Sequence, residues 1–236
     1  MLTADIASVQ YDVMAPFDFV EYAVSAAYEI TPEFMFGAGF KGIDGDVPAW
    51  DGYEVFGQYQ NEQFAVALNY TQVDDDDAIT ALYAEYAVSP EITVGLDVQS
   101  YSYLDTLHTK LSAAYDAGPI HARGYYQDGS IWIDRSLVGA RGSYDINDAF
   151  RVSAGAEVLL DNGFDATTYA VGAGYQVADG VWFDASAGQI LTETTDITRI
   201  QAMISFETGA QTRVDQRFLQ RNRGDRFASI ESVYPF

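Results

Sequence analysis

The chain contains no cysteine and few basic residues, and each shortage excludes kinds of function. Without Cys, neither disulfide bridges nor thiolate metal sites are possible. Lys and Arg together number 12 against 35 Asp and Glu, which gives a net charge of −23 over 236 residues. Because the phosphate backbone of nucleic acids attracts Lys and Arg, this charge argues against a DNA or RNA partner.

Long hydrophobic runs are also missing. No stretch approaches the roughly 18 consecutive apolar residues of a spanning helix. Residues 1–5 have neither a basic region nor an apolar core, so we expect no signal peptide: the chain is either a mature form or carries an added start Met. The composition does not shift as a linker would require, so we expect residues 1–236 to form one domain.

Aromatic residues and glycine are plentiful, with 17 Tyr, 14 Phe and 20 Gly. The dominant signal is an alternation with period two, in which every second residue is apolar or aromatic. It is clear at residues 64–70, 92–98, 150–158 and 169–175. Alternation of this kind predicts β-strands with one apolar face and one small or polar face.

A repeat of about 30 residues accompanies the alternation. Seven strand-ending aromatic residues recur at spacings of 27 to 31 residues: Tyr28, Tyr59, Tyr86, Tyr115, Tyr144, Tyr175 and Phe206. Short turns rich in Gly, Pro, Asn and Asp follow most of them, at 31–33, 89–91, 116–119, 146–148 and 178–180. One further step reaches Phe236. Since each repeat holds two strands, eight repeats predict sixteen strands.

Longer loops are expected on the rim opposite the tight turns, at 42–52, 73–78, 101–106, 128–134, 161–166, 191–195 and 221–226. Short turns on one rim and longer loops on the other are typical of bacterial outer-membrane barrels. Aromatic residues at one depth match an interfacial girdle. A soluble all-β sandwich also alternates, but its hairpins are fewer and less regular. We therefore predict an all-β fold, a transmembrane antiparallel up-and-down β-barrel whose closed sheet satisfies its backbone in hydrocarbon.

Residues 168–188, TYAVGAGYQVADGVWFDASAG, resemble the closing hairpins of Gram-negative general porins, especially those of alphaproteobacteria. The final Phe236 resembles the signal that the barrel assembly machinery recognises. The resemblance implies sixteen strands, a homotrimer, and a location in the Gram-negative outer membrane among lipid and lipopolysaccharide. It also implies a channel for passive diffusion of ions and small hydrophilic solutes.

The chain departs from the family at the third loop. Family porins narrow the pore with a long third loop, whereas the connection after the fifth predicted strand is only 73–78. The loop at 42–52, with Pro48 and Trp50, is a candidate substitute plug. An ordinary surface loop is the alternative interpretation.

If the aromatic residues face lipid, the alternate residues face water. This parity predicts pore-lining side chains at Lys41, Glu54, Glu85, Asp97, Lys110, Arg123, Arg141, Arg151, Arg199, Arg213 and Arg217. Most of the basic ones follow residue 107, while the first half of the wall is mainly acidic. These charges either set a transverse field that selects ions or pair locally with neighbours. The net charge and the acidic loops predict a preference for cations.

Two further patterns bear on ligands and catalysis. The run Asp74, Asp75, Asp76 and Asp77 is a possible Ca²⁺ site that bridges lipopolysaccharide, with a solvated loop as the alternative. No other cofactor is expected. His108 and His121 lie on successive strands, and pairing across the turn sets His121 opposite about Ala114, away from His108. They form neither a metal pair nor a catalytic dyad, so we predict that the chain is not an enzyme.

The end of the chain leaves two alternatives. The lipid face of a fifteenth strand would be poor, and five of the twelve basic residues lie in 213–226. A fourteen-stranded barrel ending at Phe206, followed by a basic tail, is therefore one interpretation. The inward parity of Arg213 and Arg217 and the closing aromatic Phe236 favour sixteen strands. A non-conducting structural or adhesive surface barrel is the alternative function.

Overall fold

The computed structural model describes residues 2–12, 17–46, 50–73, 78–102, 106–128, 136–160, 166–191 and 196–208. These residues form fourteen β-strands. The strands are β1 (Leu2–Asp12), β2 (Phe17–Thr31), β3 (Phe34–Gly45), β4 (Trp50–Gln60), β5 (Phe64–Val73), β6 (Ala78–Ala87), β7 (Ile92–Tyr101), β8 (Thr106–Ala117), β9 (Ile120–Asp128), β10 (Ser136–Asn147), β11 (Phe150–Leu160), β12 (Thr167–Ala178), β13 (Val181–Leu191) and β14 (Asp196–Thr208). None of the described segments is a helix long and apolar enough to cross a membrane.

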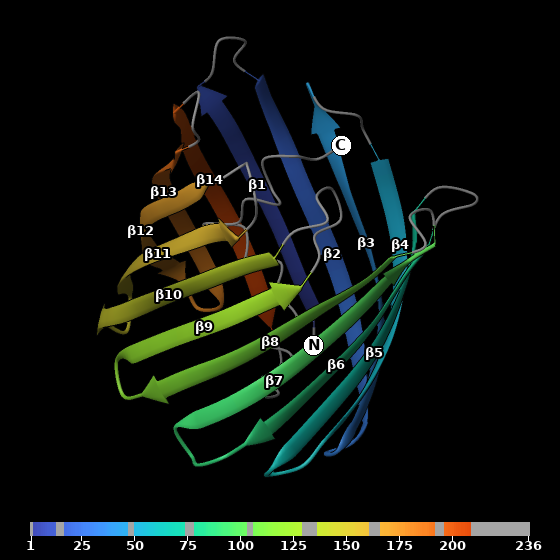
Figure 1. Cartoon of the computed structure of the whole chain (residues 1–236). Helices are drawn as coiled ribbons and strands as arrows, with labels where there is room; N and C mark the ends of the chain where they lie inside the picture. The colour runs from blue at the N-terminus through green and yellow to red at the C-terminus, as the bar shows by residue number, and fades with distance from the viewer. Residues whose placement is uncertain are drawn as a thin grey trace.

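The strands form one closed antiparallel barrel (Figure 1). Each strand pairs with its neighbours in sequence, and β1 also pairs with β14 from Leu2↔Thr208 to Asp12↔Thr198. A closed sheet has no free edge, so its strands pair their backbone groups with one another all the way round. This is the condition that a sheet must meet in hydrocarbon, and the predicted up-and-down barrel is confirmed.

The preference for sixteen strands is wrong, and the fourteen-stranded alternative is correct for the described residues. A closing strand at the end of the chain would have to pair with the first strand. Both edges of β1 are already occupied, one by β2 and the other by β14. Within the described ranges no edge remains for two more strands. Residues 209–236, which include Arg213, Arg217 and Phe236, lie outside the described residues.

The short turns lie at the predicted places in the chain, although the strands run further into some of them: only 118–119 separate β8 from β9. Each of these connections carries local chemistry that closes the chain: Gly118 and Gly180 adopt φ of 55° and 70°, conformations that favour glycine. In the 31–33 turn Thr31 Oγ1 accepts a hydrogen bond from the Phe34 amide at 3.2 Å. In the connection at 61–63, which the sequence analysis did not predict, Asn61 Oδ1 accepts a hydrogen bond from the Phe64 amide at 2.8 Å. Side-chain acceptors of this kind fix the turn geometry without help from distant residues.

The loop predicted at 42–52 is shorter than expected. Strand β3 continues to Gly45 and β4 begins at Trp50, so only residues 46–49 connect them. Residues 42–45 and 50–52 of the candidate substitute plug therefore lie in strands and not in a loop, while Pro48 lies outside the described residues. The pairing Ile43↔Trp50 shows the reason: the ladder extends into the segment that looked like a loop.

The alternation separates two faces. The seven predicted strand-end aromatic residues all lie at outward positions, and six of them are exposed: Tyr28, Tyr86, Tyr115, Tyr144, Tyr175 and Phe206. Neighbouring strands add further outward aromatic residues beside them, such as Phe36 opposite Tyr28 and Phe183 opposite Tyr175. The result is an apolar outer face with a ring of aromatic residues near the rim of short turns. That ring matches an interfacial girdle.

Candidate functional site

The inner face of the barrel carries many polar side chains, with apolar ones such as Leu137, Leu159 and Met203 among them. Its positions alternate with the exposed apolar ones, and many of its polar side chains are buried inside the ring. Among the described residues they include Gln58, Asn69, Thr71, Thr93, Gln127, Thr168, Ser186, Gln201 and Ser205. A lipid-filled or sandwich interior would carry apolar side chains here instead, whereas a polar interior is the arrangement of water-filled barrels.

Nine of the eleven charged residues predicted at inward positions are described, and all nine lie on the inner face. They are Lys41 on β3, Glu54 on β4, Glu85 on β6, Asp97 on β7, Lys110 on β8, Arg123 on β9, Arg141 on β10, Arg151 on β11 and Arg199 on β14. Acidic residues therefore occupy three of the four strands β4–β7, and a basic residue lies on each of β8–β11. Arg213, Arg217 and the four-residue run Asp74–Asp77 fall outside the described residues.

Some of these charges pair locally. Lys41 Nζ lies 3.4 Å from Glu54 Oε2 on the next strand. Arg151 donates to Asp184 Oδ1 from Nε at 3.1 Å and from Nη2 at 2.7 Å, and its guanidinium stacks 4.4 Å from the Trp182 ring. Asp184 is buried, whereas the Arg151 side chain is partly exposed to water.

Other charges are held by inward tyrosines. Tyr83 on β6 donates to Glu85 Oε2 at 2.8 Å, and its hydroxyl accepts a hydrogen bond from Arg123 Nη2 at 3.5 Å. This contact joins β6 to β9 across the inside of the two strands between them. Lys110 Nζ lies 4.1 Å from the ring centroid of Tyr125, a cation–π geometry. Both tyrosines thus position basic side chains on the inner wall.

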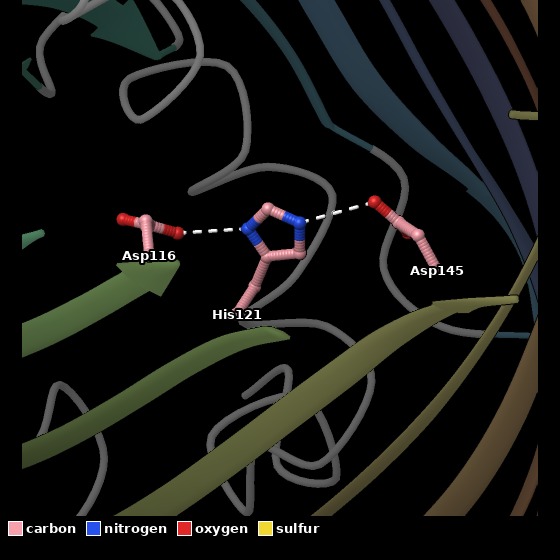
Figure 2. Close-up of polar contacts among 3 residues, drawn as sticks. All are labelled: Asp116, His121 and Asp145. Carbon is pink, nitrogen blue, oxygen red and sulfur yellow. Dashed lines mark hydrogen bonds and ion pairs between the residues drawn. The ribbon is translucent and has the colours of Figure 1, made fainter. Parts of the chain in front are cut away.

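His121 lies between the carboxylates of Asp116 and Asp145 (Figure 2), one residue after the start of β9 at the 118–119 turn. Its Nδ1 lies 2.9 Å from Asp116 Oδ1 on β8, and its Nε2 lies 3.1 Å from Asp145 Oδ2 on β10. The arrangement is satisfied when both ring nitrogens carry a hydrogen and donate, which is the imidazolium form. The three side chains clamp three neighbouring strands together beside the turns.

The sequence argument missed this cluster because its register was two residues out. His121 pairs with Asp116 and not with Ala114, since the turn contains only residues 118–119 and the strands continue up to it. The Asp116–Ala117–Gly118–Pro119 turn carried the signal that would have found the pair. His108 pairs with Gln99 on β7 and lies far along β8 from the cluster. Within the described ranges, no group of three or more His, Asp or Glu is suited to hold a metal ion.

A closed barrel that has an apolar outer face with an aromatic girdle and many polar side chains on its inner face has the architecture of an outer-membrane β-barrel. The sequence model of the Gram-negative porin family matches residues 41–195, more than half of the chain. The chain belongs to the Gram-negative porins, and it is an outer-membrane channel of a Gram-negative bacterium. The family is one of channels, in keeping with the prediction that the chain is not an enzyme.

Solved structures show the same fold. A triple mutant of the Rhodopseudomonas blastica porin is 13% identical, with a TM-score of 0.59 over 88% of this chain and 99% of that chain. Another mutant of that porin is 14% identical, also with a TM-score of 0.59 and the same coverage. At this identity the likeness supports the fold alone. No curated protein sequence matches the chain.

Proposed function

We propose that this porin is a channel for passive diffusion of ions and small hydrophilic solutes, and that it prefers cations. The observation that carries the proposal is the polar, charged inner wall of a closed barrel. Water-filled lumens of this kind pass solutes according to their size and charge. No step of chemistry is needed, because the wall only has to offer polar groups along the path.

The cation preference is supported by the charges. The net charge of the chain is −23, and a strongly negative surface raises the local concentration of cations. On the inner wall, Glu54, Glu85 and Asp97 are buried side chains of neighbouring or nearby strands. Asp97 on β7 also pairs in register with Lys110 on β8. An acidic and a basic residue therefore lie at the same height on adjacent strands.

Reversal potentials in a KCl gradient across a planar bilayer test the preference. The wild-type protein is expected to favour K⁺ over Cl⁻ at neutral pH. Asp97→Asn should lower the K⁺ preference and Lys110→Gln should raise it, because the two changes remove opposite charges at one height. Glu91→Gln, in an exposed turn, is the control and should leave the preference for K⁺ over Cl⁻ unchanged. A wild-type channel that favours Cl⁻ would refute the preference.

We also propose that the channel is a homotrimer, as the resemblance implies. The exposed alanines on the outer face of β8–β13 support a place for the contact, because small outward residues let two barrels approach each other closely. They are Ala113, Ala122, Ala140, Ala154, Ala156, Ala173, Ala185 and Ala187. Ala154→Phe should weaken the trimer on native gels, while the exposed control Ala38→Phe on β3 should not. A wild-type protein that migrates as a monomer would refute the trimer.

A non-conducting structural or adhesive barrel is the second candidate, and one observation favours it. Several inward side chains of β11–β14 are almost fully buried, including Glu157 at 2% exposed and Arg199 at 4%. An interior packed this closely would let few ions or solutes through. Single-channel conductance separates the two functions, because a surface barrel without a channel gives no unitary current steps.

A further inference from the structure

An inward tyrosine lies flat on the wall of the barrel instead of projecting from it. Tyr125 on β9 pairs in register with Gly139 on β10. A Cβ atom on Gly139 would lie 2.3 Å from Tyr125 Cζ and 2.4 Å from its hydroxyl oxygen. Real Cβ atoms do not come this close to other atoms, so the ring occupies the space that any other residue's side chain would need.

Two neighbouring strands contribute to the position of the ring. Gly139 on β10 leaves room for it, and Lys110 Nζ from β8 lies over it at 4.1 Å from the centroid. The tyrosine is only 9% exposed, so it presents little of its surface to the lumen. An aromatic ring laid over a glycine of the next strand covers exposed backbone and pins the register of the pair. Its second consequence concerns the width of the lumen.

We propose that Gly139 sets the free width of the channel by letting the Tyr125 ring lie against the wall. The inference rests on the proposed channel function. With a methyl group at residue 139, the ring must rotate about its χ1 bond, and the space open to it is the lumen. Pore width and the groups that line it determine conduction. A single methyl group at residue 139 would therefore narrow the lumen, because it displaces the Tyr125 side chain into it.

The same arrangement of an aromatic side chain over a glycine recurs on the opposite side of the barrel. Phe56 on β4 lies over its register partner Gly37 on β3, where a Cβ atom would meet Phe56 Cζ at 2.3 Å. There the Ala26 carbonyl oxygen also lies 2.5 Å from the added atom. A substitution at Gly37 would strain the backbone of β2 as well. At Gly139 all three nearest atoms belong to the tyrosine side chain, which makes it the cleaner position to test.

The experiment is a double-mutant cycle read by single-channel conductance in KCl. Gly139→Ala should lower the conductance, and in a Tyr125→Ala background the same change should have no effect, because no ring remains to be displaced. Gly124→Ala is the matched control: it lies on the other face of β9, and its added Cβ would meet only the Gly139 carbonyl oxygen, at 3.9 Å. It should conduct like the wild-type protein.

The outcomes separate the two proposals. If the wild-type protein conducts and Gly139→Ala conducts equally well, the inference is wrong and the channel function stands. If the wild-type barrel inserts and never conducts, the channel function fails and takes the inference with it. If Gly139→Ala does not assemble but the double variant does, the ring is confirmed as the obstacle. If neither assembles, the wall itself requires glycine and the inference is overturned.

Discussion

The ion pair between Arg151 and Asp184 allows a sharp test of how the inner wall is stabilised. The two side chains differ in exposure: 33% of the Arg151 side chain is exposed, against 3% for Asp184. Both hydrogen bonds of the pair end on Asp184 Oδ1, while the buried Oδ2 accepts none among the described residues. The pair lies against Gly174, where a Cβ atom would be 2.4 Å from that same Oδ1.

Removing Arg151 should therefore lower the free energy of unfolding more than removing the charge of Asp184. Arg151→Met keeps an aliphatic stem near Trp182 but leaves a buried carboxylate without its cation. We expect the free energy of unfolding to fall by about 3 kcal/mol, the lower end for a broken buried pair, because the guanidinium is partly solvated. Asp184→Asn keeps an acceptor for Arg151, whose exposed part remains hydrated. Its cost should be about 1 kcal/mol, the size of one ordinary hydrogen bond.

Urea unfolding of the protein reconstituted in lipid vesicles measures both values, with the shift between folded and unfolded bands on unheated gels as a second readout. The double variant should be more stable than Arg151→Met alone, since it contains no uncompensated charge. An Asp184→Asn protein that is as destabilised as Arg151→Met would refute the reasoning. That result would mean that water reaches the carboxylate and that burial does not govern the pair.

Three further changes test other parts of the structure. Leu68→Arg places a cation on the outer face at the middle of β5 and should cost about 2–4 kcal/mol in vesicles, with Leu68→Ile as control; an unchanged urea midpoint would contradict a lipid-facing position. A chain ending at Thr208 should still form a heat-modifiable barrel, because β14 already pairs with β1, and failure to insert would show that later residues are needed. His121→Ala leaves Asp116 and Asp145 facing each other without a cation and should lower the urea midpoint, with His121→Gln less affected. An alanine variant as stable as the wild-type protein would show that the cluster contributes nothing.

The sequence by itself determined the strands, the turns and the two faces. Alternation with period two assigns each residue of a strand to one side, so the outward Tyr144 and the inward Arg141 followed from local spacing alone. The turns predicted at 116–119 and 178–180 followed from glycine and neighbouring residues, which act within a few positions, although the strands run further into both turns than predicted. These properties depend on contacts between residues close in the chain, and such contacts are visible in a sequence.

Only the tertiary structure decided where the ring closes and which side chains meet. The 30-residue repeat continues to Phe236, yet β1 pairs with β14, because closure depends on the stagger of the whole sheet and not on any local pattern. His121 meets Asp116 and Asp145 because the turn contains only two residues, which places His121 opposite Asp116 and not opposite Ala114 as the sequence analysis expected. Tyr125 lies on Gly139 because their strands bring them side by side at one height. Register and closure are properties of the pairing between strands, and no single strand contains them.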